Sequence, residues 1–253
     1  MMQKIALITG ATSGIGRATA YALANVGYAL ILCGRRADRL ATEKADLEKI
    51  TPVLTCSFDV RDQEAVKASI GSLPDEWRSI DVLVNNAGNA HGLDPIQSGD
   101  VRDWDAMMDI NVKGLLYVTK EILPGMMDRK AGHIINLGSI AGKEVYPNGN
   151  VYCASKFAVD ALTRGMRMDL NPYGIKVTSV NPGLVETEFS LVRFKGDEAR
   201  ARSVYQGFDP LQAEDIADIL AYAVTRPDHV VLADITVFPK AQGSSTLVNK
   251  NIK

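Results

Sequence analysis

Short runs of apolar residues alternate along the chain with longer segments in which apolar residues recur at helical spacing. The short runs are rich in Val, Ile and Leu, and Gly, Pro, Asn or Asp bound them, which is typical of strands. They predict strands at residues 4–10, 29–35, 52–60, 80–88, 132–139, 175–183 and 234–239. The segments between them predict helices that include residues 16–27, 36–50, 62–73, 103–129 and 151–170.

This alternation is typical of a parallel sheet whose strands are joined by crossover helices. The predicted strands are almost continuously apolar, as expected when helices cover both faces of a sheet. The sequence contains no internal repeat, low-complexity tract or linker. The pattern therefore predicts an α/β protein: a single doubly wound (Rossmann) domain over residues 1–253, with a mostly parallel sheet of about seven strands.

One segment departs from the alternation. Residues 184–208 follow a predicted strand but are polar and charged, unlike an ordinary crossover helix. Long insertions at the carboxyl edge of such a sheet often close over an active site. We therefore expect a substrate lid at about residues 184–208.

Composition is ordinary for a globular protein with a buried core, since 46% of the 253 residues are hydrophobic and 23% are charged. The formal net charge of −2 gives no sign of a nucleic-acid-binding surface. No apolar run approaches the roughly 18 residues of a membrane-spanning helix, and polar residues interrupt the N-terminal stretch too soon for a secretory signal. We expect a cytoplasmic protein without nucleic-acid or membrane partners.

Cysteine and histidine give no sign of a metal site. Cys33, Cys56 and Cys153 lack the paired spacing of metal ligands, and an odd number of cysteines fits a reducing compartment. Cys153 has no Cys/His arrangement around it that would favour a nucleophile. The three histidines are scattered along the chain.

The turn TGATSGIG, after the first predicted strand, has glycines in the spacing G-x-x-x-G-x-G. Such a turn lets the backbone approach a pyrophosphate closely and points a helix N-terminus at the anion. Its position between the first strand and the first helix favours a dinucleotide site over a simple strand-to-helix turn. The candidate cofactor-binding residues here are Gly10, Ser13, Gly14, Ile15 and Gly16.

Two arginines stand where a dinucleotide site ordinarily has an acidic residue. In NAD sites a carboxylate at the end of the second strand, roughly 20 residues past the glycines, binds the ribose 2′-hydroxyl. This chain has Arg35 and Arg36 there. A guanidinium binds phosphate through paired donors, whereas a carboxylate repels it. The pair predicts NADP as the cofactor; the alternative is a solvated arginine pair that opens a helix.

Two further strand ends carry candidate cofactor contacts, because the carboxyl ends of parallel strands border the ligand crevice of an open sheet. Asp59 and Val60 end the third predicted strand, and Asn86, Ala87 and Gly88 end the fourth. The Asp59 carboxylate can accept from an adenine amino group, and the backbone after Asn86 can approach adenine and its ribose. Each stretch taken alone is more typical of a turn than of a site.

Tyr152 and Lys156 lie four residues apart near the start of a predicted helix, so their side chains share one helix face. A surface tyrosine beside a lysine stem is one interpretation. The other is a catalytic phenol, because a free tyrosine has a pKa of about 10 and a neighbouring cation stabilises its phenolate. Lys156, together with a positively charged oxidised nicotinamide, would bring the pKa of Tyr152 towards working pH.

Taken in order, the motifs resemble those of the classical short-chain dehydrogenase/reductase family over essentially the full chain. They are Thr9-Gly10-x-x-x-Gly14-x-Gly16, Asn85-Asn86-Ala87-Gly88, Asn111, Ser139, Tyr152-x-x-x-Lys156, and Pro182-Gly183 followed by Thr187. This combination is far more specific than any single motif. The resemblance implies an NADP-dependent oxidoreductase acting on CH-OH groups.

The resemblance also implies a role for each catalytic residue. Tyr152 would be the general acid/base, and Lys156 would lower its pKa and hold the nicotinamide ribose. Ser139 would donate to the substrate oxygen, and Asn111 would bend its helix and carry a water-linked proton relay to the lysine. The residues implied to hold the nicotinamide, with its pro-S side towards the substrate, are Pro182, Gly183, Val185 and Thr187.

Other stretches, such as "GRRADRL", "SLPDEW" and "EFSLVRFKGDEARA", are similar to the subgroup that oxidises 3-hydroxy acids with NADP. Serine, L-allo-threonine and 3-hydroxypropionate-type compounds are its substrates, and its members also reduce the matching semialdehydes. A small-molecule substrate would bind at Ser139 and Tyr152. One of the lid cations could pair with a substrate carboxylate, and the alternative is that they form a solvated basic helix; they are Arg193, Lys195, Arg200 and Arg202.

Two alternative functions remain open. The first is a carbonyl or 3-oxoacyl reductase of the same family. A carrier-bound substrate would favour a basic docking surface, of which the net charge of −2 gives no sign. The second is an NADP-sensing binding protein without catalysis, which would not need Ser139, Tyr152 and Lys156 together. The family resemblance further suggests a homotetramer.

Overall fold

The computed structural model describes residues 3–251, and within them seven strands form one sheet in which all neighbours are parallel. The strands are β1 (Ile5–Thr9), β2 (Ala29–Gly34), β3 (Val53–Ser57), β4 (Ile80–Asn85), β5 (Gly132–Leu137), β6 (Ile175–Pro182) and β7 (Asp234–Val237). Their order, β3-β2-β1-β4-β5-β6-β7, confirms the predicted doubly wound α/β fold. No helix in the described range is long and apolar enough to cross a membrane.

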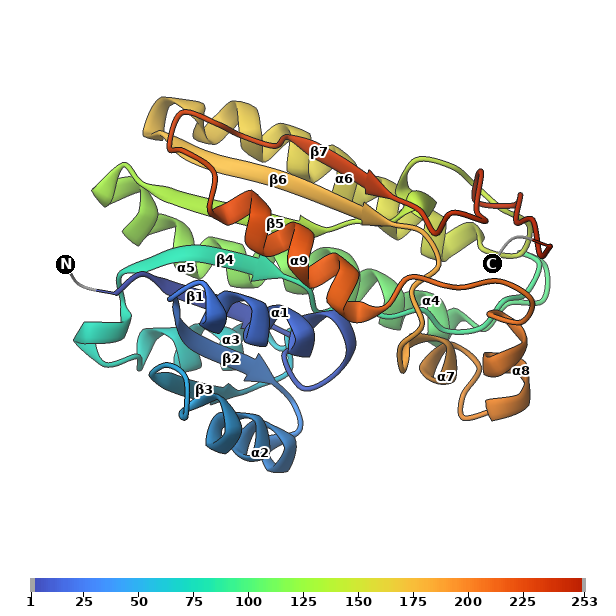
Figure 1. Cartoon of the computed structure of the whole chain (residues 1–253), viewed down its shortest axis with the longest axis horizontal. Helices are drawn as coiled ribbons and strands as arrows, with labels where there is room; N and C mark the ends of the chain where they lie inside the picture. The colour runs from blue at the N-terminus through green and yellow to red at the C-terminus, as the bar shows by residue number, and fades with distance from the viewer. Residues whose placement is uncertain (1–2, 252–253) are drawn as a thin grey trace.

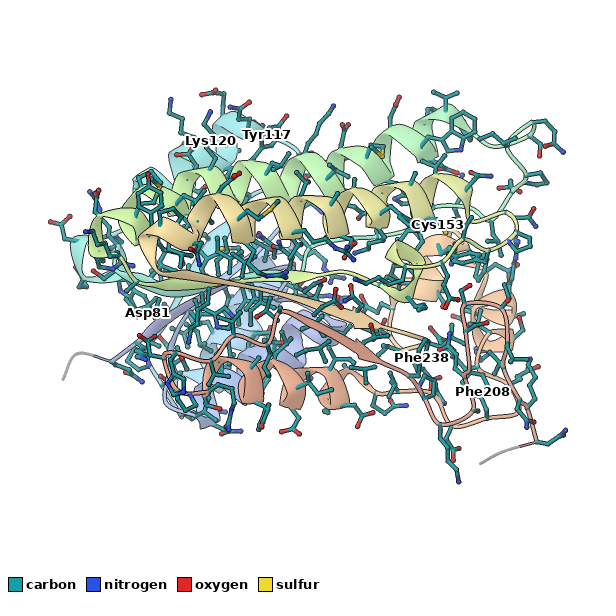
Figure 2. The ribbon with its side chains drawn as sticks, turned by 90° about the horizontal axis from the view of Figure 1, so that it is seen from above. Asp81, Tyr117, Lys120, Cys153, Phe208 and Phe238 are labelled. Carbon is teal, nitrogen blue, oxygen red and sulfur yellow. The ribbon has the colours of Figure 1, made fainter. Side chains whose placement is uncertain are left out.

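Helices cover both faces of the sheet (Figures 1 and 2). Those on one face are α1 (Gly14–Asn25), α2 (Ala37–Leu47) and α9 (Ala213–Val224). Those on the other face are α3 (Gln63–Gly71), α5 (Leu115–Arg129) and α6 (Asn150–Leu170). Strand β1 serves both layers, because successive side chains of a strand point to opposite faces. Ala6 and Ile8 pack beneath α1 and α9, whereas Ile5 and Leu7 pack beneath α3 and α5.

The strand order reverses between β1 and β4, which places a crevice at the carboxyl ends of these strands. In Figure 1 the arrowheads of β2, β6 and β7 point to the right, so this edge lies on the right of the view. Three short helices gather there. They are α4 (Val101–Met108), α7 (Phe189–Arg193) and α8 (Glu198–Ser203).

Three features differ from the sequence prediction. The helix predicted at residues 103–129 is divided into α4, a π-helical segment (Asp109–Gly114) and α5. Strand β3 ends at Ser57, so Asp59 and Val60 lie in the turn after it rather than in the strand. The prediction also omits α9, which begins with a capping box between Gln212 and Asp215.

Residues 184–208 leave the sheet after β6 and form α7 and α8. The two helices are joined by a turn with positive φ at Lys195 and Gly196. Two contacts fasten this segment to the region after β4. Gly92 N donates to the carbonyl oxygen of Arg193 at 2.9 Å, and Lys195 pairs with Asp103 of α4 at 2.9 Å. The segment therefore lies over the carboxyl edge of the sheet.

Candidate active site

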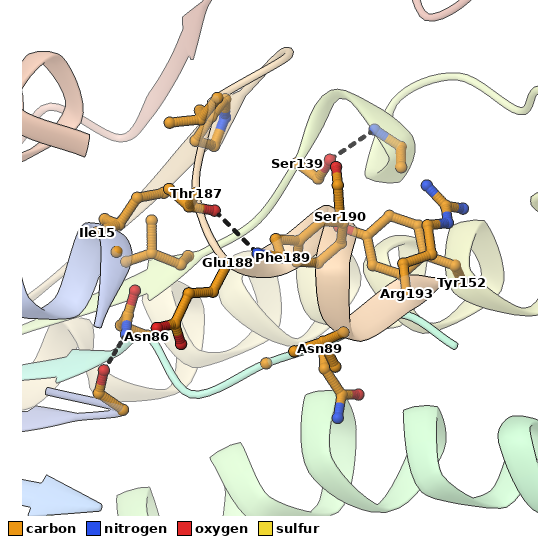
Figure 3. A pocket seen from close by; sticks show the side chains of 18 of the residues that line it. Ile15, Asn86, Asn89, Ser139, Tyr152, Thr187, Glu188, Phe189, Ser190 and Arg193 are labelled. Carbon is orange, nitrogen blue, oxygen red and sulfur yellow. Dashed lines mark hydrogen bonds between the residues drawn. The ribbon is translucent and has the colours of Figure 1, made fainter. Parts of the chain in front are cut away.

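A cavity of about 530 Å³ lies at the carboxyl edge of the sheet, beneath the segment that contains α7 (Figure 3). It brings together most of the residues predicted from the sequence. Those lining it are Gly10, Ser13, Gly14, Ile15, Arg35, Arg36, Asp59, Val60, Asn86, Ala87, Gly88, Ser139, Tyr152, Lys156, Pro182, Gly183, Val185 and Thr187. Gly16 and Asn111 are not among the lining residues. Both pack against residues that do line the cavity or that neighbour them in the chain.

The glycine turn presents bare backbone to the cavity. Gly10 and Gly14 have φ of +66° and +50°, a left-handed conformation that favours glycine. Gly16 is required by packing, because a Cβ there would lie 2.3 Å from both Asn86 Nδ2 and the Gly10 carbonyl oxygen. Asn86 Nδ2 donates to the carbonyl oxygens of Thr9 and Gly10 at 2.9 and 3.2 Å. These bonds clamp the turn to the end of β4.

Arg36, which follows β2, is held at the same end of the cavity. Its Nη2 donates to Thr12 Oγ1 and Ser13 Oγ at 2.8 and 2.9 Å. Its Nη1 pairs with a carboxylate oxygen of Glu188 at 3.1 Å. The guanidinium and the hydroxyls of the glycine turn therefore converge on one point, an arrangement that suits a phosphate monoester.

Asp59, predicted to contact adenine, is bound by arginines. Its carboxylate accepts hydrogen bonds from Arg61 at 2.7 Å and from Arg35 at 3.5 Å. Burial acts to raise the pKa of Asp59, but the hydrogen bonds from Arg61 and the charges of Arg61 and Arg35 together outweigh burial, and the pKa is lowered. Asp59 is therefore ionised, and it ties Arg35 to the turn after β3.

Tyr152 and Lys156 lie one turn apart on α6, and Ser139 follows β5; all three line the cavity. Tyr152 and Lys156 are only 8% and 7% exposed. Lys156 Nζ donates to the carbonyl oxygen of Leu137 at 2.8 Å. Burial lowers the pKa of Lys156 to about 8, because an ammonium is poorly stabilised away from water.

The lowering of the Tyr152 pKa by Lys156 together with an oxidised nicotinamide stays a prediction, and the surroundings within the chain act in the other direction. Burial raises the pKa of Tyr152, the Tyr146 phenol adds to the rise, and Ser139 and Arg193 only partly offset it. The Lys156 ammonium is engaged by a backbone carbonyl and is not among the main contributors. Tyr152 therefore carries its proton at neutral pH, the form that can protonate a carbonyl oxygen.

Asn111 lies in the π-helical segment and is 2% exposed. Its Oδ1 accepts from Asn89 N at 2.8 Å, and its Nδ2 donates to the Asn89 carbonyl oxygen at 2.9 Å. Nδ2 also donates to Ser155 Oγ at 3.0 Å. Asn111 thus joins the loop after β4 to α6, the helix that carries Tyr152. Its implied part in a proton relay stays a prediction.

Arg193, the last residue of α7, lies beside Tyr152 in the site (Figure 3). Its guanidinium carbon lies 5.3 Å from the centre of the Tyr152 ring and 5.5 Å from that of Tyr146. Nη2 donates to the Tyr146 hydroxyl at 2.7 Å, and Nε donates to the Gly92 carbonyl oxygen at 3.2 Å. Of the four lid cations named from the sequence, Arg193 lines the cavity and the other three do not.

The sequence prediction misses other lining residues, among them the polar side chains of Tyr146, Glu188 and Gln242. Glu188 directly follows Thr187 of the predicted nicotinamide loop. Its position and its charge are the sequence features that could have marked it as a site residue. Gln242 belongs to a polar stretch near the end of the chain that gives no sign of burial. It is nonetheless 5% exposed, and its Oε1 accepts from Leu184 N at 2.8 Å.

Among residues 3–251, His, Cys, Asp and Glu side chains form no group of three or more that could hold a metal ion. His133 is buried in β5, where its Nε2 lies 2.8 Å from Thr178 Oγ1. Burial lowers the pKa of His133 to about 3, so it is a neutral core residue. His91 lies outside the main cavity.

Comparison with known proteins bears on the same site. Residues 4–197 match the family described as short chain dehydrogenase. The chain is 46% identical over 245 residues to sulfoacetaldehyde reductase 2 of Chromohalobacter salexigens, covering 96% of this chain and 97% of that protein. It is 44% identical over 244 residues to the NADP-dependent 3-hydroxy acid dehydrogenase of Salmonella typhi, covering 96% of this chain and 98% of that protein.

Solved structures share the fold. The closed form of serine dehydrogenase complexed with NADP⁺ has a TM-score of 0.92 at 42% identity, covering 96% of this chain and 98% of that chain. Serine dehydrogenase from Escherichia coli has a TM-score of 0.82 at 37% identity, covering 94% and 99%. Since the family match spans most of the sequence and the relatives extend over nearly all of it, the chain belongs to the short chain dehydrogenase family.

Proposed function

We propose that the protein is an NADP-dependent oxidoreductase that transfers a hydride between the nicotinamide and a small hydroxy acid, or its aldehyde or keto form. The enzyme class and the cofactor follow from the family and its NADP-dependent relatives. One observation carries the substrate class: the Arg193 guanidinium lies beside Tyr152 in the cavity. A guanidinium there can bind an acid group while the phenol exchanges a proton with the substrate oxygen.

The residues present fit NADP. Gly14 has a φ of +50°, and a Cβ there would lie 3.3 Å from the Thr187 side chain, so a larger residue would crowd the space between the turn and the loop after β6. Arg36 and Ser13 supply donors suited to the 2′-phosphate. When bound, the nicotinamide accepts or gives up the hydride. The other cofactor-binding residues named from the sequence remain part of this proposal.

The chain's own residues handle the proton. Tyr152 donates its proton to the substrate oxygen in reduction and accepts it in oxidation. Ser139 Oγ accepts from Ala141 N at 3.1 Å, which leaves the Ser139 hydroxyl proton free to donate to the same substrate oxygen. Lys156 adds positive charge near the phenol and holds the cofactor ribose. Asn111 positions α6 through its hydrogen bond to Ser155.

The remaining lid cations already have partners. These are Asp103 for Lys195 at 2.9 Å, Glu198 for Arg202 at 2.9 Å and the ring of Phe194 for Arg200 at 4.4 Å. Arg193 also donates to Tyr146 and Gly92, but it is the lid cation that lines the cavity, so it is the one best placed to meet a substrate. The relatives are named for 3-hydroxy acids, serine and sulfoacetaldehyde, and these compounds share a short chain with an anionic group. Both a carboxylate and a sulfonate suit a guanidinium.

The test of this proposal compares an acid with a neutral alcohol of the same length. We would measure kcat/KM for 3-hydroxypropionate and 1-propanol with NADP, in the wild type and in Arg193→Gln. We expect Arg193→Gln to lower kcat/KM for the acid about 10- to 100-fold, because a charge-assisted hydrogen bond is lost. The value for 1-propanol and the dissociation constant of NADP should stay within about threefold. Arg202→Gln, on an exposed helical face, is the control and should change neither.

Equal losses for the acid and the alcohol would mean that Arg193 supports Tyr146 and Tyr152 instead of binding substrate. Wild-type activity confined to ketones or acyl thioesters would favour the carbonyl or 3-oxoacyl reductase alternative. Binding of NADP without turnover of any of these compounds would favour the NADP-sensing protein.

We further propose, from the family resemblance, a cytoplasmic homotetramer in which residues 184–208 act as the substrate lid. Exposed apolar side chains on α5 and α6 support a subunit interface on this face of the sheet. They are Leu116, Phe157 and Met168.

A further inference from the structure

Glu188 bridges two arginines at the end of the cavity where the 2′-phosphate of NADP is proposed to bind. One carboxylate oxygen accepts from Arg36 Nη1 at 3.1 Å, and the other accepts from Arg39 Nη1 at 2.8 Å. Figure 3 shows Glu188 on the loop between Thr187 and Phe189, facing the cavity. An anionic group of the protein therefore already uses guanidinium donors that a phosphate at this point would need.

We propose that Glu188 competes with the 2′-phosphate for Arg36 and Arg39, and thereby sets how strongly the protein prefers NADP over NAD. This inference rests on the proposed NADP site and adds two residues to it, Glu188 and Arg39. Binding of the phosphate displaces the Glu188 carboxylate and leaves both guanidiniums free to donate to the phosphate oxygens. A ribose 2′-hydroxyl carries no charge and has no need to displace the carboxylate.

The charges around Glu188 support this competition. Arg36 is anchored on its other side by Thr12 and Ser13, so it stays at the glycine turn when Glu188 leaves. Burial acts to raise the pKa of Glu188, but the hydrogen bonds and positive charges of Arg39 and Arg36 together outweigh burial and lower the pKa. Glu188 is therefore an anion at neutral pH, and two anions cannot share these donors without repulsion.

The strength of the effect is limited by exposure. The side chains of Glu188, Arg36 and Arg39 are 44%, 39% and 45% exposed, so each ion pair contributes modestly. A phosphate with two charges and three acceptor oxygens can therefore replace the carboxylate. Glu188 should weaken NADP binding several-fold without preventing it.

The opposite role is also physically possible, and it predicts the opposite sign. If Glu188 served to hold Arg36 and Arg39 in position for the phosphate, its removal would loosen both guanidiniums and weaken NADP binding. The two roles are separated by binding measurements on the isolated phosphate-bearing part of the cofactor.

The experiment is calorimetric titration of wild type and Glu188→Gln with adenosine 2′,5′-bisphosphate, AMP, NADP and NAD. We expect Glu188→Gln to bind the bisphosphate and NADP about 3- to 10-fold more tightly, while AMP and NAD stay within about twofold. Glu186→Gln is the matched control, because Glu186 is on the same loop, is exposed and forms no ion pair within residues 3–251. It should change none of the four affinities.

A double-mutant cycle with Arg39→Gln tests the shared donor. In the Glu188→Gln background, Arg39→Gln should weaken the bisphosphate by a larger factor than in the wild type. The reason is that Arg39 in the wild type must first break its hydrogen bond to Glu188. That loss offsets part of the free energy that Arg39 gains by binding the phosphate. Circular dichroism and thermal unfolding of each variant check that the fold is kept.

Unchanged or weaker bisphosphate binding in Glu188→Gln, or equal losses from Arg39→Gln in both backgrounds, would overturn the inference. Its failure is distinguishable from failure of the NADP assignment. If the wild type binds the bisphosphate no better than AMP, the NADP site itself is wrong. If the wild type prefers the bisphosphate and Glu188→Gln does not alter that preference, the competition alone is wrong.

Discussion

Burial affects the protonation of two residues in the site, Lys156 and Tyr152. Lys156 is 7% exposed and its pKa is lowered to about 8, so at neutral pH its ammonium is kept charged against the effect of burial. Burial acts in the other direction on Tyr152 and keeps its proton in place. Such arrangements are typical of sites where stability is given up for chemistry.

The lowered pKa of Lys156 is tested by comparing the free energy of unfolding of the wild type with that of Lys156→Met. Between pH 8 and 10.5 the unfolded chain binds the Lys156 proton and the folded chain releases it, so the wild type gains stability as pH rises. The methionine variant lacks this proton. We expect the free energy of unfolding of the wild type, relative to Lys156→Met, to rise by about 3 kcal/mol over that range.

Urea unfolding of both proteins at a series of pH values measures this difference, since all other titrating groups are common to the two. The variant also loses the hydrogen bond to Leu137, which shifts the whole difference by a constant. Parallel stability curves across this pH range would show that Lys156 is not charged and buried in the folded protein.

At the scale of elements, the ends of β1 and β4 are joined by one hydroxyl. Thr9 Oγ1 accepts from the amides of Asn86 and Ala87, both at 3.0 Å, and donates to the carbonyl oxygen of Val84 at 3.3 Å. This join fixes the glycine turn against the loop that carries the predicted adenine-side contacts. It lies at the reversal of strand order, where the crevice of such a sheet forms.

Thr9→Val should lower the free energy of unfolding by about 2–4 kcal/mol, because two amides and a carbonyl lose their partner in a nearly isosteric side chain. The dissociation constant of NADP should rise as well, since the turn is released from β4. Thr9→Ser is the control: it keeps the hydroxyl, and losing one methyl group should lower stability by no more than about 1.5 kcal/mol. Urea unfolding and NADP titration measure both effects. Similar unfolding free energies and NADP dissociation constants for Thr9→Val and Thr9→Ser would show that Thr9 acts through packing and not through its hydroxyl.

Element prediction succeeded where the signal was local and failed where it was not. The seven strands follow from apolar runs, whereas the glycine turn and Tyr152-x-x-x-Lys156 stand out through their spacing together with the family resemblance of the ordered motifs. Arg36 and Glu188 lie 152 positions apart, and Arg193 and Tyr146 lie 47 apart, so only the folded chain brings these pairs together. The rise in the pKa of Tyr152 likewise depends on burial by residues from several segments, which no local pattern reports.

At the scale of the whole molecule, the sheet order brings the loops after β1, β2, β4, β5 and β6 to one edge. Arg36, the proposed phosphate-binding arginine, lines the cavity they form, and Arg193 at the end of α7 lies beside Tyr152 in the same cavity. The segment at residues 184–208 spans both ends, since Glu188 contacts Arg36 and Arg193 contacts Tyr152. Cofactor and substrate would therefore be covered by one piece of chain.

The most direct test of the account is the initial rate of NADP reduction with L-serine, L-allo-threonine and 3-hydroxypropionate, in the wild type and in Tyr152→Phe. The same rates with NAD serve as the cofactor control. We predict turnover of at least one acid with NADP, much less with NAD, and a loss of about 10²- to 10⁴-fold in kcat for Tyr152→Phe with unchanged NADP affinity. Full turnover by Tyr152→Phe would contradict the role of Tyr152. If the wild type binds NADP but turns over none of the hydroxy acids, the proposed function is contradicted.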